Sequence, residues 1–367
     1  MEQVAEQNRT EQKFNLNYQE LKELAIQRPT QVIEGLICER QNALLMGRFG
    51  VGKTMLGLQM SLSLATGHEF VGRKVAKAYP TVIVDCENDL GDVKDRLMKQ
   101  HDALGLTEAD DALLTANWRY VSAADPRSEF YGMKLDQGNF AGLLDFVRQF
   151  NPEVLVIDNL GLVVAKGDLK EAEEAKNFYT ALGKLRNESE SLRNGVIIVM
   201  HHLTKPGESL PNEGGSSLLT SPDVFLSKAR GTGRVLDFAQ ARLAISEERA
   251  GNETYYVFHG INRSTVPVPM IMQFNTDTLC FEKHENQQLR FEQVFCTRRK
   301  GREIFEAWPD GFTWSDAESL IDPKTRKPFN KDTVNKTRQT CLNEGFIGYS
   351  ADTKQYHKIL RLRERQT

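Results

Sequence analysis

The sequence predicts an α/β fold with a mainly parallel central sheet. Short apolar, β-branched runs carry this prediction, at residues 42–46, 81–84, 154–157 and 196–200. Runs that are apolar on both faces are typical of buried parallel strands, and long helical patterns between them indicate crossover helices. We expect these helices at residues 53–66, 90–104, 139–150 and 168–194.

The composition is that of an ordinary globular protein of 367 residues, 40% hydrophobic and 26% charged, so a disordered or fibrous chain is excluded. Residues 1–17 are polar, and no run approaches the roughly 18 apolar residues of a membrane span. We therefore expect a cytoplasmic protein with no membrane partner. The five cysteines form no CxxC pair, which favours reduced thiols over disulfides or zinc ligands.

The chain divides into four parts. Residues 1–29 are predicted to be a polar or helical extension, and residues 30–284 the main domain. Within that domain, residues 241–246, 255–259 and 270–274 alternate with turn residues and are expected to extend the sheet as antiparallel strands. The charged, poorly patterned stretch at 285–302 predicts a linker before a C-terminal domain at 303–367.

The C-terminal part is basic, although the whole chain has a net charge of −3. We expect a first helix at 313–320, with Ser315 as N-cap and Glu318 completing a capping box. A second, basic helix at 330–343 and a hairpin of residues 346–349 and 356–362 would complete a winged helix-turn-helix, which binds duplex DNA or a replication partner protein. The alternative is a small α+β cap whose basic residues are merely solvated. The basic residues of the second helix are Lys331, Lys336 and Arg338.

The strongest motif follows the first apolar run. Residues 47–54, GRFGVGKT, match GxxxxGK[ST] without exception. In this motif, glycines let backbone N–H groups surround phosphates at a helix N-terminus, Lys53 reaches the β- and γ-phosphates, and Thr54 ligates Mg²⁺. The alternative is a structural glycine-rich turn before an amphipathic helix. We predict an ATP and Mg²⁺ site formed by Gly47, Gly50, Val51, Gly52, Lys53, Thr54 and Met55.

Acidic residues follow two other strands. Asp158 ends the run at 154–157, where it is placed to hold Mg²⁺, but Asn159 follows it where many related ATPases have a glutamate. We therefore expect Glu87 to be the general base, on the argument that Asp85, Glu87 and Asp89 alternate at a strand end and point the same way. The alternative is that these acids cap the next helix, which suits Asp89 best.

Two histidines end the run at 196–200. A polar side chain at this strand tip would lie beside the γ-phosphate, and we favour His202 over His201 as a sensor of its loss. The alternative for both is a structural histidine. The residues provide no Ser/His/Asp triad or metal cluster that would compete for the catalytic role.

Over residues 30–275 these segments resemble the RepA-like hexameric replicative helicases, a group of RecA-like P-loop ATPases of the AAA_25 type. Besides GRFGVGKT, the resemblance rests on ATGHEFVGR, VIVDCEND, VLVIDNL and VIIVMHHLTKPG. It implies a RecA-like core that hydrolyses ATP and assembles as a homo-oligomeric ring, expected to be a hexamer. The ring would bind single-stranded DNA in a central channel and unwind the duplex ahead of it, in plasmid or phage-type replication.

Two further segments resemble elements of this family. ARGTGRVLDFAQARLAI, at 229–245, resembles the element after the DNA-binding loop, and YYVFHGINRSTVPVP resembles the strand with a K-x-R arginine finger. Arg263 matches the arginine, whereas Ile261 stands at the lysine position. The resemblance implies that Arg263 reaches the nucleotide of a neighbouring subunit; otherwise it is an exposed hairpin residue. Loops 161–170 and 203–230 would face the channel and contact DNA phosphates through Lys166, Lys205, Lys228 and Arg230.

Two other functions remain open at this point. One is a RecA-like regulatory or recombination ATPase that assembles on DNA without unwinding it. The other is a replication initiator whose C-terminal domain binds a specific duplex site while the ATPase acts as a switch.

Overall fold

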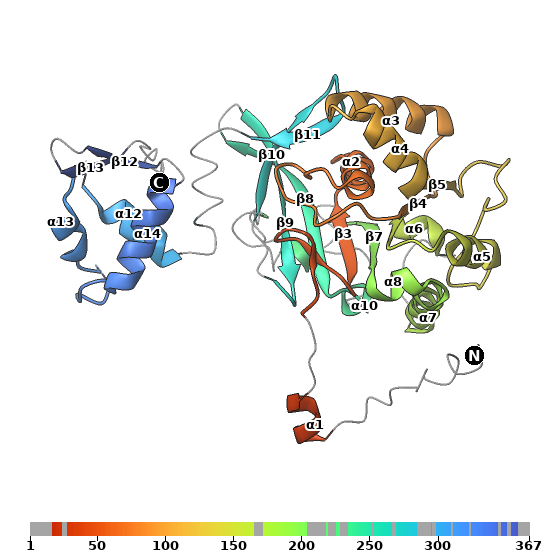
Figure 1. Cartoon of the computed structure of the whole chain (residues 1–367), viewed down its shortest axis with the longest axis horizontal. Coiled ribbons are helices and arrows are strands. Elements are labelled where there is room, and N and C mark those ends of the chain that lie inside the picture. Colours follow the sequence, from red (N-terminus) through yellow and green to blue (C-terminus); the bar gives the residue numbers. More distant parts are fainter. Residues whose placement is uncertain are drawn as a thin grey trace, which may run out of the picture.

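A nine-stranded sheet forms the centre of the main domain (Figure 1), with the strand order β11-β10-β9-β8-β3-β7-β6-β4-β5. Strands β8 to β5 of this order are parallel, and β9, β10 and β11 extend the sheet in antiparallel fashion. The strands are β3 (Asn42–Gly47), β4 (Thr81–Asp85), β5 (Trp118–Ser122), β6 (Val154–Asp158), β7 (Val196–His202), β8 (Ala241–Ala250), β9 (Glu253–Asn262), β10 (Met270–Asn275) and β11 (Cys280–Lys283). The mainly parallel sheet with an antiparallel extension is therefore confirmed.

The structure is a computed structural model. It describes residues 17–23, 28–164, 172–203, 218, 225–227, 234–250, 253–265, 269–284, 295, 299–309, 311–322, 324–343, 346–350 and 354–358. Ahead of the sheet, the described residues include α1 (Tyr18–Glu23) and a small antiparallel pair, β1 (Gln31–Ile33) and β2 (Ile37–Cys38).

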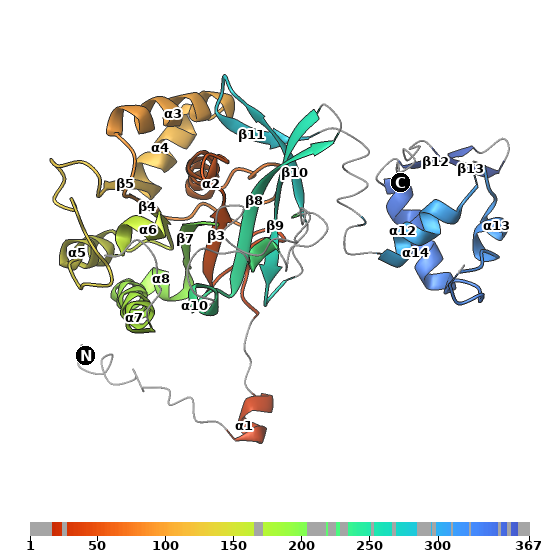
Figure 2. The same cartoon turned by 180° about the vertical axis from the view of Figure 1, so that it is seen from behind.

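Helices cover both faces of the sheet (Figures 1 and 2) because its parallel strands are apolar on both sides. Leu44 of β3 faces one hydrophobic cluster and Leu45 the other. The first cluster includes α5 and α7, and the second α2 and α3. The helices are α2 (Lys53–Thr66), α3 (Leu90–Ala103), α4 (Glu108–Asn117), α5 (Ala141–Phe150), α6 (Leu160–Val163), α7 (Ala172–Glu188), α8 (Glu190–Asn194) and α10 (Arg234–Asp237).

The topology brings four strand ends together. β7 lies between β3 and β6, and β4 lies on the far side of β6. Because these strands are parallel, the loops after β3, β4, β6 and β7 leave the same edge of the sheet. The core is therefore α/β with a mainly parallel sheet, as the sequence predicts.

The prediction of a single helix at 168–194 is wrong for the described part of that range. α7 ends at Glu188, and a new helix, α8, begins after Ser189. The Ser189 hydroxyl accepts a hydrogen bond from the N–H of Leu192 and lies 2.8 Å from Asn151 Oδ1, to which it donates. This N-cap divides the two helices because a serine oxygen replaces the carbonyl that a continuous helix would supply.

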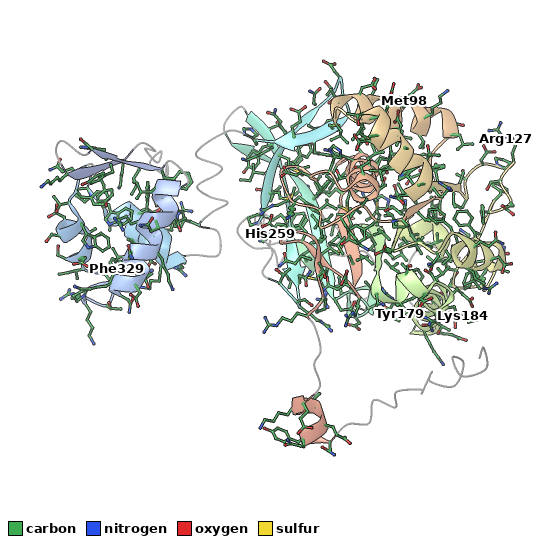
Figure 3. All side chains as sticks on the ribbon, viewed as in Figure 1. Met98, Arg127, Tyr179, Lys184, His259 and Phe329 are labelled. Carbon is green, nitrogen blue, oxygen red and sulfur yellow. The ribbon has the colours of Figure 1, made fainter. Side chains whose placement is uncertain are left out.

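The C-terminal residues form a separate hydrophobic cluster (Figure 3), which includes Phe329. Their elements are α12 (Arg299–Ala307), α13 (Trp314–Glu318), α14 (Lys331–Asn343), β12 (Ile347–Ser350) and β13 (Gln355–Lys358). β12 and β13 pair as an antiparallel hairpin. α12 begins at Arg299, inside the stretch expected to be a linker, whereas residues 285–294 lie outside the described residues. The winged helix-turn-helix stays a prediction.

The capping box of the first C-terminal helix lies two residues earlier than expected. Thr313, not Ser315, is the N-cap of α13, and its side chain accepts from the N–H of Asp316. The Asp316 carboxylate in turn accepts from the N–H of Thr313, at 2.8 Å. Ser315 and Glu318 lie within the helix. An aspartate therefore plays the part that the sequence analysis gave to a glutamate.

Within the described part of the chain, no helix combines the length and the apolar character that crossing a bilayer requires.

Candidate nucleotide-binding site

The P-loop between β3 and α2 has the backbone that the glycine motif predicts. Gly50 and Gly52 have φ angles of +78° and +90°, which disfavour side chains. Gly52 is also the N-cap of α2 and provides no side-chain cap, so it leaves the first N–H groups of the helix to an external anion. Val51 is buried and Met55 is half-buried in the core, so only their backbone can face a phosphate.

Lys53 folds back over this loop. Its ammonium group donates to the carbonyl oxygens of Gly47, at 3.1 Å, and Arg48, at 2.9 Å. Burial lowers the pKa of Lys53 to about 8, although the charges of Asp158 and Glu87 act in the opposite direction. A buried cation held by two neutral carbonyls is poorly compensated, and a triphosphate would compensate it better.

Thr54 and Asp158 meet beside the P-loop. The Thr54 hydroxyl, in the first turn of α2, donates to Asp158 Oδ2, at the end of β6, at 2.7 Å. Burial raises the pKa of Asp158 to about 7, while the hydrogen bond from Thr54 opposes the shift. A hydroxyl and a buried carboxylate side by side fit Mg²⁺, which takes few protein ligands and otherwise phosphate oxygens and water. The predicted metal ligands are thus side by side.

Glu87 lies in the loop after β4, and Asn159 in the loop after β6. The Asn159 amide donates to Glu87 Oε2 at 2.7 Å. Asn159 is 3% exposed, whereas Glu87 is exposed. A buried amide therefore fixes one oxygen of an accessible carboxylate and leaves the other oxygen available to a water molecule.

The expectation that Asp85, Glu87 and Asp89 share one direction is wrong. Asp85 is buried, and its carboxylate accepts from the N–H groups of Glu87 and Asn88, at 2.8 and 3.0 Å. These bonds turn the chain directly after β4, so strand alternation stops there. Asp89 caps α3 by accepting from the N–H of Gly91, at 2.7 Å. The capping alternative therefore holds for Asp89.

The two histidines point to opposite faces of β7. His201 is 1% exposed, whereas His202 Nδ1 lies 3.2 Å from the ammonium of Lys53. The ring of Phe49, which is 82% exposed in the P-loop, is tilted against His202 at 6.2 Å between centroids. The structure thus brings His202 to the P-loop lysine.

The P-loop is supported from behind by the edge hairpin. Gln59 of α2 exchanges two hydrogen bonds, both of 2.8 Å, with the backbone of Phe281 in β11. A Cβ atom at Gly52 would lie 2.8 Å from Cζ of the Phe281 ring. Gln100 of α3 adds a bond to the carbonyl of Leu279, at 2.7 Å. The antiparallel extension therefore packs directly against the phosphate loop.

Arg263 lies away from this site. It is exposed, directly after β9, and its N–H donates to the carbonyl of Gln240. The register pairs Asn262 with Ala241, and Ala241 with Ala43 near the start of β3, so Arg263 stands at the sheet edge opposite the P-loop. The length of β3 separates the two, about 17 Å at about 3.3 Å per residue.

The residues predicted to bind DNA, Lys166, Lys205, Lys228 and Arg230, lie outside the described residues.

Comparisons with known proteins bear on this site. A family model described as an AAA domain matches residues 7–208, which is more than half of the chain. The chain belongs to the AAA domain family. Its matched range contains the P-loop, Glu87, Asp158 and His202, and family and fold together make the chain a P-loop ATPase.

No curated protein matches this AAA domain protein. Among solved structures it is similar to the crystal structure of a KaiC-like protein from the hyperthermophilic archaeon Pyrococcus horikoshii. The sequence identity is 16% and the TM-score 0.45, and the match covers 70% of this chain and 99% of the archaeal chain.

Sequence reasoning missed several residues of the site. It treated Asn159 only as a missing glutamate, although an amide after the metal-side aspartate was itself the available signal. It also missed Gln59 and Phe281, which are 222 residues apart in sequence and share no local pattern. The exposed Phe49 was visible only as an apolar residue within a glycine-rich loop.

Proposed function

We propose that this AAA domain protein is an ATP-driven hexameric ring that binds single-stranded DNA in its channel and unwinds duplex DNA. The observation that carries the proposal is the separation of Arg263 from the P-loop of its own chain. An arginine at that edge completes an ATP site only when a second subunit presents it, and repeating that contact around an axis closes a ring.

The described residues divide the work at the phosphates. Lys53 exchanges its carbonyl partners for the β- and γ-phosphates, and the N–H groups of the P-loop surround the same oxygens. Thr54 and Asp158 are the residues that would hold Mg²⁺, which supplies charge neutralisation and orientation of the phosphates. ATP binding thus converts a poorly compensated buried lysine into a paired one.

Glu87 is the proposed base for the attacking water. Glu87 lies in the loop after β4, the strand that pairs with the β6 strand of Asp158, and Asn159 holds its carboxylate. The free oxygen accepts the proton of the water, while Arg263 of the neighbouring subunit stabilises the charge of the transferring phosphoryl group.

His202 is the proposed link to DNA. His202 Nδ1 lies 3.2 Å from the ammonium of Lys53, so a γ-phosphate bound by Lys53 would change the surroundings of His202. His202 ends β7, and the chain continues from it into the loop at 203–230, which we propose contacts the DNA backbone together with loop 161–170.

A mixing experiment tests the ring. Arg263→Ala and Lys53→Ala are each expected to be inactive alone. In an equal mixture, about a quarter of the interfaces combine an intact P-loop with an intact arginine, so up to about a quarter of the parental ATPase rate should return. No recovery at any ratio would refute an arginine supplied by a neighbour. Near-normal hydrolysis by Lys53→Ala alone would instead refute the nucleotide site.

A second set of measurements tests the DNA motor. We expect the oligomeric mass to rise with ATP and an oligo-dT strand, the same strand to stimulate hydrolysis, and a forked duplex to be separated. Rings that hydrolyse ATP on single strands without separating the fork would favour the regulatory or recombination ATPase. A monomer whose hydrolysis ignores DNA would contradict the proposal.

A further inference from the structure

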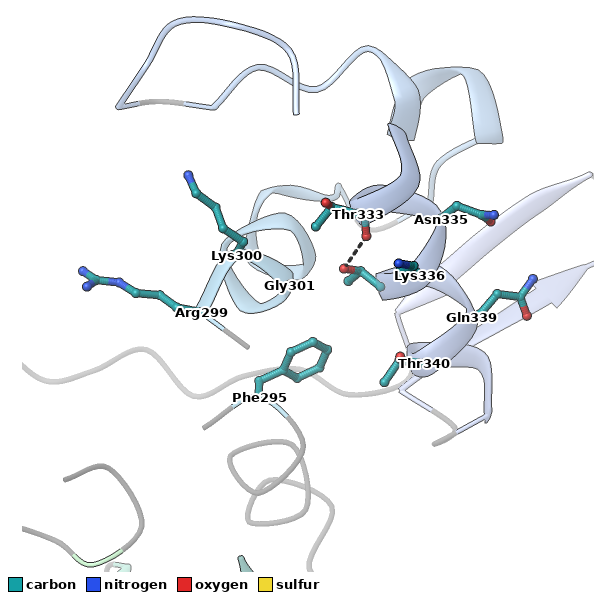
Figure 4. A pocket seen from close by; sticks show the side chains of 10 residues that line it. Phe295, Arg299, Lys300, Gly301, Thr333, Asn335, Lys336, Gln339 and Thr340 are labelled. Atoms are coloured by element: carbon teal, nitrogen blue, oxygen red, sulfur yellow. Dashed lines mark hydrogen bonds between the residues drawn. The ribbon is translucent and has the colours of Figure 1, made fainter. Parts of the chain in front are cut away.

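The C-terminal part contains a cavity that the nucleotide site does not use. It lies between α12 and α14 and has a volume of about 780 Å³ (Figure 4). Arg299 and Lys300 border it from α12, and Asn335, Lys336 and Gln339 from α14. Cations and amides thus surround one opening.

The basic side chains at this opening differ in whether an acidic side chain lies close to them. Lys300 is paired with Asp322, at 2.6 Å, and Glu303, at 3.4 Å, and Arg299 lies 3.7 Å from Glu303. Lys336 is exposed and has no ion-pair partner among the described residues. Lys336 therefore presents an uncompensated positive charge at the opening.

The surrounding charge has the same sign. Residues 286–367 of the sequence include sixteen Lys and Arg against eleven Asp and Glu. A net positive field favours the approach of a polyanion.

Arg338, which the sequence grouped with Lys336, has a different position. Its guanidinium donates to the Tyr356 hydroxyl and, at 2.9 Å, to Asn335 Oδ1, and it lies 4.5 Å from the ring centre of Trp314. Arg338 follows Lys336 by two residues, which is about 200° of rotation around the helix. It therefore packs toward α13 and the hairpin, on the other side of α14 from Lys336. It serves the fold and orients Asn335.

The amides of α14 point to the kind of polyanion. Asn335 and Gln339 are exposed and one turn apart, and Lys336 lies beside them. Arg338 occupies Oδ1 of Asn335, so the Asn335 NH₂ group is left to donate outward. An acidic peptide offers carboxylates, for which cations suffice, whereas the base edges of DNA offer donors and acceptors that Asn and Gln match.

We infer that the exposed face of α14 reads duplex DNA in the major groove, with Arg299 and Lys300 of α12 against the phosphate backbone. A major groove accommodates one α-helix, and this face carries both amides and an unpaired lysine. The site is separate from the nucleotide site and from the single-strand channel of the proposed motor, so it adds a second class of nucleic acid to the ligands of this chain.

Fluorescence anisotropy of the full-length chain with a labelled duplex of mixed sequence, without ATP, tests the inference. Lys336→Ala should weaken binding about fivefold to tenfold and reduce the slope of log K against log salt by about one, because one phosphate or base contact is lost. Lys184→Ala is the matched control, since Lys184 is an exposed lysine of α7 in the main domain (Figure 3). It should leave both quantities unchanged.

Base reading has its own measurement. Duplexes selected from a random pool by the parent should share preferred base pairs, and Gln339→Ala should lose the preference at one of them by about tenfold. Absence of duplex binding by the parent, an unchanged Lys336→Ala, or an equal loss in Lys184→Ala would overturn the inference. So would selection of the same sequences by Gln339→Ala. Because nucleotide is absent throughout, any of these failures leaves the ATPase proposal standing.

Discussion

Replacing Asp158 by asparagine should stabilise the fold while abolishing Mg²⁺-dependent hydrolysis. Asp158 is 3% exposed, and burial raises its pKa from 3.8 to about 7. The unfolded chain ionises this group near its ordinary value, so the folded state resists ionisation by about three pH units. At about 1.4 kcal/mol per unit, the ionised carboxylate costs the fold about 4 kcal/mol.

Because the pKa of Asp158 is raised in the folded state, the stability of the fold depends on pH between the unfolded and folded pKa values. Below about pH 4 the group is protonated in both states, and the stability that this provides is fully present. It is lost progressively as the pH rises toward about 7, and the full cost applies above that value. Asparagine is neutral and still accepts the hydrogen bond of Thr54, so the stabilisation by Asp158→Asn should grow from near zero at about pH 4 to about 4 kcal/mol at about pH 8.

Urea denaturation of the metal-free and nucleotide-free chain, followed by circular dichroism at several pH values, measures this difference. Asp277→Asn is the matched control, because Asp277 is an exposed carboxylate in the turn between β10 and β11. Its difference from the parent should stay flat with pH. A flat difference for Asp158→Asn as well would refute the reasoning that burial, uncompensated by a metal, sets the charge of this site.

Other substitutions test the remaining parts of the site. Glu87→Gln should retain ATP binding and lose at least about a hundredfold in kcat; normal turnover would assign the base elsewhere. Asn159→Ala should lower kcat about tenfold with little change in KM for ATP, and an unchanged kcat would contradict its role in holding Glu87. Gln59→Ala should destabilise the core by about 1–3 kcal/mol in urea denaturation, since two buried bonds to Phe281 are lost; no change would refute that anchoring. Since bound phosphates favour a charged Lys53, ATP affinity by calorimetry should fall up to about tenfold per pH unit above about 8, and a flat profile would argue against this contact.

The positions of strands that are buried on both faces could be predicted from the sequence. Residues 154–157 are apolar throughout, and the structure has β6 as Val154–Asp158. β5 was missed because Trp118–Ser122 is an edge strand with half-exposed residues, which breaks the apolar run. β11 was missed for a similar reason, since its four residues mix buried and exposed positions.

The site was predictable wherever its residues follow a strand or belong to a local motif. The P-loop, Asp158 and His202 are of this kind. The partner of Glu87 was not, because Asn159 is 72 residues away and only the pairing of β4 with β6 brings the two loops together. The direction of Asp85 also depends on a turn formed by its own hydrogen bonds, which the pattern of strand alternation does not contain.

The contact of Gly52 with Phe281 has a mechanical consequence. The P-loop has no free space between Gly52 and the Phe281 ring. The two hydrogen bonds of Gln59 hold the backbone of Phe281 against α2. A ligand that moves Gly52 must therefore also move β11, the outermost strand. β11 is the last described element before residue 285, so a displacement of the P-loop would reach the chain where it leaves the nine-stranded sheet.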